Sequence, residues 1–198
     1  MTIEVGARAP DFSLKGTDGR TYALTEALAR GPLLLAFFKT TCGTCDLAFP
    51  YINRFAEAYP TNGWSLWAVA QDPPQAAGSY AASHRMTYPV LPDVDGYPVS
   101  RAYDPPATPT LFLFDREGQV VGESSGFSKK DMNSLSTALA ERLRAEPAVI
   151  APAGDGNPDF LISTLDARNN TWTVTQRSPF GQALANTSPE GRTTSSSY

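Results

Sequence analysis

Two cysteines, Cys42 and Cys45, are the residues of this sequence whose type and spacing point most directly to chemistry. They are the only cysteines of the chain, and only Gly43 and Thr44 separate them. A disulfide between them would close a minimal loop and add little stability, because the stabilisation grows with the length of the closed loop. A disulfide scaffold would also use more cysteines, spread along the chain. The pair therefore predicts redox chemistry rather than a structural crosslink.

The surroundings of the pair predict an activated thiol. Residues 33–38 form an unbroken apolar run with the length of a buried strand, and apolar spacing indicates a helix from about Thr44 to Tyr59. Cys42 then lies at the start of a helix, where unpaired N–H groups and the helix dipole favour a thiolate by about 0.3 to 2 kcal/mol. That corresponds to a pKa lower by roughly one unit or slightly more. We expect Cys42 to attack and Cys45, one turn into the helix, to resolve.

Several neighbours are expected to assist Cys42. Lys39 would lower its pKa further if the ammonium group reached the sulfur, and the hydroxyls of Thr40, Thr41 or Thr44 could donate hydrogen bonds to it. All of these effects act in the same direction, because each favours the charged form of the thiol.

The rest of the sequence predicts an α/β domain over residues 1–146, with a central mixed β-sheet flanked by helices. The expected strands lie at 9–14, 33–38, 64–70, 88–91, 109–114 and 119–123, and the expected helices at 25–30, 44–59, 74–84 and 128–143. Pro50 interrupts the second helix, and we expect it to kink that helix rather than end it, since the apolar period resumes beyond it.

The composition shifts after residue 146 to Pro, Gly, Asn, Ser and Thr. This predicts a tail of low order over 147–198. A marginal hairpin at 160–176 would have to dock on the domain, because two strands alone are seldom stable in water. The remainder is expected to be disordered, and residues beyond 146 are expected to be dispensable for stability.

Composition also argues against several classes of partner. The net charge of −4 provides no electrostatic footprint for nucleic acid or an anionic membrane. No apolar run approaches the ~20 residues needed to cross a bilayer. The first residues, 1–5, have neither a basic start nor a signal-like apolar core, which predicts a cytoplasmic protein, or a periplasmic or secreted one if a leader was removed.

A metal centre is not expected. A CxxC pair can be half of a zinc site, but tetrahedral zinc needs about four ligands. Beyond the two cysteines the chain offers His84 as its only histidine, and we expect this residue to be a surface or capping histidine. No cofactor is predicted besides the redox-active pair itself.

Residues from about 5 to 144 resemble the thioredoxin-like redoxins, in particular the TlpA/ResA and AhpC/TSA group. Three motifs carry the resemblance: Gly6–Leu14, Leu35–Cys45 and Thr108–Phe114. It implies a thioredoxin-like fold in which the Thr108–Pro109 bond is cis and this loop lies beside the cysteines. Thr108 would then offer backbone hydrogen bonds to an extended substrate. Pro50 stands where the helix-kinking proline of the family is expected.

Two positions depart from the family pattern. Thr41 stands where a tryptophan commonly precedes the first cysteine, so that aromatic contact surface is missing. Ala36 stands where thioredoxin has a buried aspartate that assists proton transfer to the resolving cysteine. Resolution would then be slower, or Lys39 or water would take over this proton transfer.

We therefore expect a thiol-disulfide oxidoreductase that exchanges a Cys42–Cys45 disulfide with protein or small-molecule disulfides. A reductant or oxidant partner of unknown identity would complete the cycle. The direction of electron flow depends on the reduction potential, which Gly43 and Thr44 do not fix.

The first alternative is a thiol peroxidase of the AhpC/TSA type, with the motif P-x-x-x-T-x-x-C. Neither register fits. If Cys45 attacks, Cys42 takes the place of the threonine and Phe38 that of the proline; if Cys42 attacks, the two places fall to Lys39 and Leu35. The second alternative is a non-enzymatic redox sensor or binding module.

Overall fold

The computed structural model describes residues 2–59 and 62–157, together with the backbone of four later strands. Those later strands are β8 (Phe160–Ser163), β9 (Thr173–Arg177), β10 (Ala183–Thr187) and β11 (Thr193–Thr194). The earlier strands are β1 (Ser13–Lys15), β2 (Thr21–Ala23), β3 (Leu33–Phe38), β4 (Ser65–Ala70), β5 (Val90–Pro92), β6 (Thr110–Phe114) and β7 (Val120–Phe127). The helices of the described residues are α1 (Leu24–Arg30), α2 (Gly43–Ala58), α3 (Pro74–Ser83), α4 (Pro98–Tyr103) and α5 (Lys129–Leu143).

A mixed sheet organises the domain around β3. Its core strands follow the order β7-β6-β3-β4-β5, and β8 to β11 continue it beyond β7. Strand β3 pairs in parallel with β4 and antiparallel with β6, which confirms the mixed sheet that the sequence predicts. All six residues of β3 are buried, because both faces of this central strand are covered.

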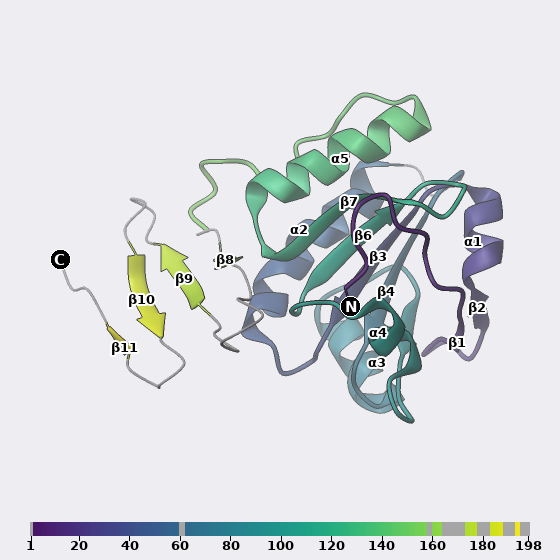
Figure 1. The fold of residues 1–198 in the computed structure, drawn as a ribbon, viewed down its shortest axis with the longest axis horizontal. Helices are drawn as coiled ribbons and strands as arrows, with labels where there is room; N and C mark the ends of the chain where they lie inside the picture. The colour runs from purple at the N-terminus through teal and green to yellow at the C-terminus, as the bar shows by residue number, and fades with distance from the viewer. Residues whose placement is uncertain are drawn as a thin grey trace.

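Helices cover both faces of the sheet (Figure 1), and each face holds its own hydrophobic core. Successive side chains of a strand point to opposite faces. The even-numbered residues of β3 therefore pack with α2, α3 and α5, whereas its odd-numbered residues pack with α1, α4 and the N-terminal segment. Helices on both faces were expected from the alternation of elements, and the structure confirms them.

Helix α4 is an element that the sequence pattern does not predict. It has six residues, and Asp93 fixes its start from five positions upstream of Pro98. The buried carboxylate of Asp93 accepts hydrogen bonds from the backbone N–H groups of Val99 at 3.2 Å and Ser100 at 2.7 Å. These bonds satisfy N–H groups that a helix start leaves without partners. The cap is therefore supplied from outside the local sequence, where a search for capping patterns misses it.

The chain continues to pack on the domain after α5. The composition predicts low order from residue 147, whereas Ile150 and Ala151 are buried in the core that α2 and α5 share. The side chain of Asn133 donates to the Ala151 oxygen at 2.8 Å and accepts from the Ala151 N–H at 2.9 Å. Arg54 donates to the Ile150 oxygen at 2.7 Å. These long-range contacts hold a segment whose composition is typical of a loop.

The predicted hairpin at 160–176 coincides with two described strands. Strands β8 and β9 pair antiparallel, with Phe160 opposite Gln176, and β8 also pairs with β7. Residues 164–172, where the predicted turn falls, lie outside the described residues.

Candidate functional site

The two cysteines lie where β3 leads into α2. Cys42 is the N-cap residue of α2, in an extended conformation, and Cys45 is one turn inside the helix. The Cys42 oxygen accepts hydrogen bonds from the N–H groups of Cys45 at 2.9 Å and Asp46 at 3.2 Å. Cys42 is half-buried and Cys45 is fully buried, and both are free thiols. Only the first sulfur is therefore open to a substrate.

The environment separates the acidities of the two thiols. Hydrogen bonding from the Cys45 thiol, opposed by burial and aided by the N–H groups of Cys45 and Thr44, lowers the pKa of Cys42 from 9.0 to about 5. The same hydrogen bond, now with burial acting in the same direction, raises the pKa of Cys45. At neutral pH Cys42 is a thiolate and Cys45 a thiol. Because the thiolate is the nucleophile, this asymmetry supports Cys42 as the attacking residue.

The loop between α4 and β6 lies next to Cys42, because β6 pairs antiparallel with β3 and begins where β3 ends. Its Thr108–Pro109 peptide bond is cis, as the resemblance implies. The Cys42 sulfur lies 3.1 Å from the Thr108 oxygen and donates a hydrogen bond to it in the neutral thiol form. The Pro109 oxygen accepts from the Gly126 N–H at 2.7 Å, and this bond ties the loop to β7. The attacking sulfur and a backbone edge that could meet an extended substrate therefore lie side by side.

The threonines around the pair act differently from the prediction. Thr40 donates its N–H and its hydroxyl to the Asp72 carboxylate, at 2.8 and 2.9 Å. Its hydroxyl is thus directed to Asp72, which steadies the turn between β3 and α2. Thr44 lowers the pKa of Cys42 through its backbone N–H. Thr41 is exposed.

The remaining predicted site residues have positional roles. Lys39 is exposed, and its backbone oxygen accepts from the Cys42 N–H at 3.2 Å. Its side chain lines a cavity next to the cysteines. Gly43 is the first residue of α2 and has open space where a side chain would be. Pro50 lies inside α2 with its ring exposed, so the helix continues past it as predicted.

An acidic and aromatic cluster flanks the cysteines and was missed from the sequence. Asp46 follows Cys45 directly, and its carboxylate lies 3.2 Å from His84 Nε2. The His84 ring stacks on Tyr80 with 3.8 Å between ring centroids. Burial, together with Asp46, raises the pKa of Tyr80. His84 is also the C-cap residue of α3. The spacing of Tyr80 and His84, four positions apart on a predicted helix, was the available signal for their pairing.

Within residues 2–59 and 62–157, no three His, Cys, Asp or Glu side chains converge as metal ligands.

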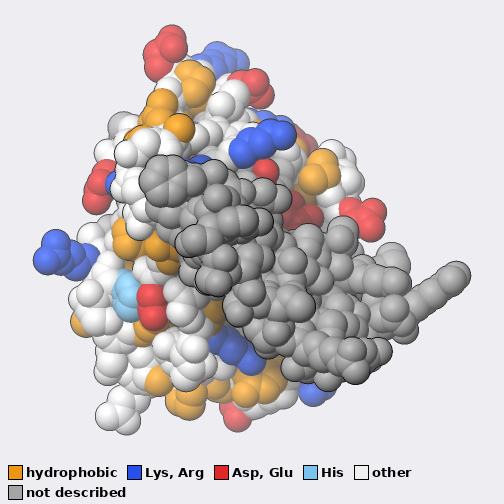
Figure 2. Space-filling view, turned by 90° about the vertical axis from the view of Figure 1, so that its left-hand side faces the viewer, with side chains coloured by type: hydrophobic (Ala, Val, Ile, Leu, Met, Phe, Trp, Pro, Cys, Tyr) orange, Lys and Arg blue, Asp and Glu red, His pale blue; other side chains and the backbone are white. Residues whose placement is uncertain are grey.

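None of the helices that the structure describes is long and apolar enough to cross a bilayer. Figure 2 shows basic and acidic side chains interspersed over the visible face rather than gathered into one basic patch.

Known proteins resemble this chain in sequence and in fold. A sequence model of the Redoxin family matches residues 4–139. The thiol-disulfide oxidoreductase ResA of Geobacillus thermodenitrificans is 32% identical over 130 residues, which cover 65% of this chain and 74% of that protein. ResA of Bacillus subtilis is 31% identical over 132 residues, 66% of this chain and 73% of that protein. The crystal structure of a protein assigned as the thiol:disulfide interchange protein DsbE of Chlorobium tepidum is 29% identical, with a TM-score of 0.64 over 72% of this chain and 99% of that one.

Proposed function

We propose that this chain exchanges disulfides with protein substrates, with Cys42 as nucleophile and Cys45 as resolving residue. The chain belongs to the Redoxin family and is a thiol-disulfide oxidoreductase with a CxxC site on a thioredoxin-like fold. The asymmetry of the two sulfurs carries this proposal. Cys42 is half-exposed with a pKa of about 5, whereas Cys45 is fully buried with a raised pKa.

In the first step the Cys42 thiolate attacks one sulfur of the substrate disulfide. The substrate S–S bond breaks, a Cys42–substrate disulfide forms, and the other substrate sulfur leaves as a thiolate that takes a proton from solvent. The Thr108 oxygen lies 3.1 Å from the Cys42 sulfur, so a substrate strand that pairs with this backbone edge would lie next to the reacting atoms.

In the second step Cys45 loses its proton to solvent and attacks the Cys42 sulfur. The mixed disulfide breaks, the Cys42–Cys45 disulfide forms, and the second substrate sulfur leaves as a thiolate. Two electrons have then passed from the Cys42–Cys45 dithiol to the substrate, and an external dithiol must return them.

The second step is helped by a change in the acidity of Cys45. The largest cause of the raised Cys45 pKa is its hydrogen bond to Cys42. Once Cys42 is bound in a mixed disulfide, that sulfur is no longer an anion and this cause disappears. The Cys45 pKa therefore falls at the stage when its thiolate is required. Burial still raises this pKa, so the change assists the loss of the Cys45 proton at a site where Ala36 takes the position of the buried aspartate of thioredoxin.

Turnover of insulin disulfides with dithiothreitol tests the proposal. We expect the wild-type protein to catalyse this reduction and Cys42→Ser to abolish it. Cys45→Ser should accumulate a mixed disulfide, visible by intact mass and reversed by added thiol. A mixed disulfide that forms on Cys45 in the Cys42→Ser variant, with turnover retained, would contradict the assigned roles. Rapid turnover of hydrogen peroxide without disulfide reduction would favour the peroxidase alternative instead.

The cytoplasmic location stays a prediction. Fractionation of cells that produce the full-length protein, followed by detection of the chain in each fraction, would test it.

A further inference from the structure

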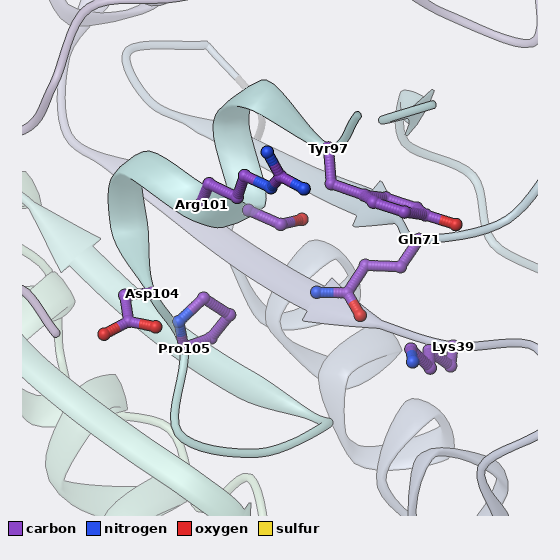
Figure 3. Close-up of a pocket in the computed structure, with 7 residues that line it drawn as sticks. Lys39, Gln71, Tyr97, Arg101, Asp104 and Pro105 are labelled. Carbon is purple, nitrogen blue, oxygen red and sulfur yellow. The ribbon is translucent and has the colours of Figure 1, made fainter. Parts of the chain in front are cut away.

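A cavity of about 290 Å³ opens beside the cysteines, at the ends of β3 and β4 and against α4 (Figure 3). Lys39 follows β3, Gln71 follows β4, and Tyr97 and Arg101 come from the start and body of α4. The cavity thus gathers side chains that are far apart in the sequence at the edge of the sheet that carries Cys42.

The cavity shares two of its walls with the catalytic site. Lys39 lines it with its side chain while its backbone oxygen holds the Cys42 N–H at 3.2 Å. Pro105 also lines it and belongs to the loop that continues to Thr108, whose oxygen contacts the Cys42 sulfur at 3.1 Å. The cavity therefore adjoins the place where a substrate disulfide meets Cys42.

Two cations give the cavity its charge. Lys39 and Arg101 are both exposed, and over residues 2–59 and 62–157 neither side chain has an ion pair or a hydrogen bond. Asp104 is the acidic residue of the lining, and it is not without a partner. In Figure 3 Asp104 lies on the opposite side of the view from Lys39. The lining therefore carries two cationic side chains and one carboxylate.

A buried hydroxyl without a partner belongs to a residue that lines the same cavity. Ser100 lines the cavity, is 6% exposed, and its hydroxyl has no hydrogen-bond partner in the part of the chain that the structure describes. Its backbone N–H is fixed by Asp93 at 2.7 Å, so the residue is held in place. A buried polar group without a partner costs stability, and such groups are rare in folded proteins. The hydroxyl itself is closed to solvent, so it bonds a ligand oxygen only when the Ser100 side chain turns toward the cavity.

The lining groups together are donors for an oxyanion. The Lys39 ammonium, the Arg101 guanidinium, the Gln71 amide and the Ser100 hydroxyl all carry N–H or O–H groups. In Figure 3 the Gln71 amide lies between Arg101 and Lys39. Hydrogen bonds from charged donors to a carboxylate are stronger than those between neutral groups.

We propose that this cavity binds a carboxylate close to the disulfide of the substrate, so that the protein prefers acidic disulfide substrates. The proposal rests on the proposed function, because it concerns which disulfides reach Cys42. The carboxylate can come from an Asp or Glu side chain of a protein or from a small acidic disulfide. The residues of the cavity are binding residues, and their effect is expected in KM rather than in kcat.

Two matched pairs of substrates test this proposal. The first pair is a peptide disulfide with Glu next to one cysteine and the same peptide with Gln. The second pair is 3,3′-dithiodipropionate and the neutral 2-hydroxyethyl disulfide, which have similar sizes. For the wild-type protein we expect kcat/KM to favour the acidic member by about three- to tenfold at low salt. This preference should shrink as salt is raised, because the cations are exposed to solvent.

Variants separate the cavity from the general charge of the protein. Arg101→Gln should bring the acidic-to-neutral ratio of kcat/KM close to one, and Ser100→Ala should reduce it in part. Lys130→Gln removes an exposed cation from α5 and should leave the ratio as in the wild type. An Arg101→Gln ratio equal to that of the wild type would overturn the proposal.

The outcomes also keep the two proposals apart. A preference in the peptide pair alone identifies a protein side chain as the source of the carboxylate, and a preference in both pairs identifies any carboxylate near the disulfide. Equal rates within both pairs, with turnover intact, overturn the cavity proposal and leave the proposed function standing. Failure to reduce any of the four substrates overturns the proposed function itself.

Discussion

The start of α2 and the segment after α5 both stabilise an anion at the edge of the core. The first anion is a thiolate that can react, and the second is a carboxylate that holds the chain in place. At the start of α2, Cys42 is held as a thiolate with a pKa of about 5, yet it remains half-exposed. After α5, burial of Asp155 is outweighed by hydrogen bonds from Lys129 and Tyr51, and the pKa of this carboxyl falls from 3.8 to about 2.

The difference lies in how fully the donors surround the anion. Asp155 accepts from Lys129 through one carboxylate oxygen and from the Tyr51 hydroxyl through the other. The Asn157 N–H adds a third bond at 3.1 Å, and the Asn157 amide in turn donates to the Tyr51 oxygen at 2.7 Å. Cys42 keeps an open side toward solvent. A surrounded anion fastens the chain, whereas a partly open one can react.

Truncation of the segment after α5 should produce the largest change in the free energy of unfolding. Ending the chain after residue 146 removes the buried Ile150 and the Asp155 bonds. Because full burial of such an apolar side chain stabilises by about 1.5 to 3 kcal/mol, we expect a loss of about 2 to 4 kcal/mol in the free energy of unfolding. Urea unfolding followed by tryptophan fluorescence would measure it.

A chain that ends after Asn157 is the matched control and should keep the contacts of Ile150 and Asp155. If the truncation after residue 146 unfolded at the same urea concentration as this control, residues 147–157 would be dispensable, as the composition alone suggests.

Asp155→Asn should have a smaller and pH-dependent effect. The folded-state pKa of Asp155 is lowered, so its contribution is present above the unfolded value of 3.8 and is lost as the pH falls toward about 2. We expect the variant to be less stable by about 1 kcal/mol at pH 7, after allowance for solvent screening, and to match the wild type near pH 2.

Thermal unfolding from pH 2 to 7 would measure the difference between the two proteins. A difference that stays constant over this range would show that Asp155 stabilises by packing rather than by charge. Insulin reduction by the variant should equal that of the wild type, since the described hydrogen bonds of Asp155 join it to neither cysteine.

The sequence predicts the parts of the molecule whose signals are local. Strand β3 occupies the predicted residues 33–38 because its apolar run is short, unbroken and buried on both faces. The CxxC pair and the helix that follows it are also local patterns. The cis bond before Pro109 came from the resemblance, because nothing in the residue types alone distinguishes it.

The parts that depend on distant partners could not be predicted. Ile150 is buried because Arg54 bonds its backbone oxygen and Asn133 bonds the next residue, although the composition there is typical of a loop. Ser100 enters the cavity because Asp93 caps α4 from outside it. The sequence left open whether the Lys39 ammonium reaches the sulfur. Its exposed side chain lines the cavity, because β3 and β4 end side by side there.

The pH dependence of Cys42 alkylation tests the central claim most directly. The rate of reaction with iodoacetamide, followed by mass spectrometry in the wild type and in Cys45→Ala, reports the fraction of thiolate. A midpoint near pH 5 in the wild type, raised in Cys45→Ala because the largest cause of the lowered pKa is removed, is the expected result. A wild-type midpoint near the ordinary value of 9.0, or one that Cys45→Ala leaves unchanged, would contradict it.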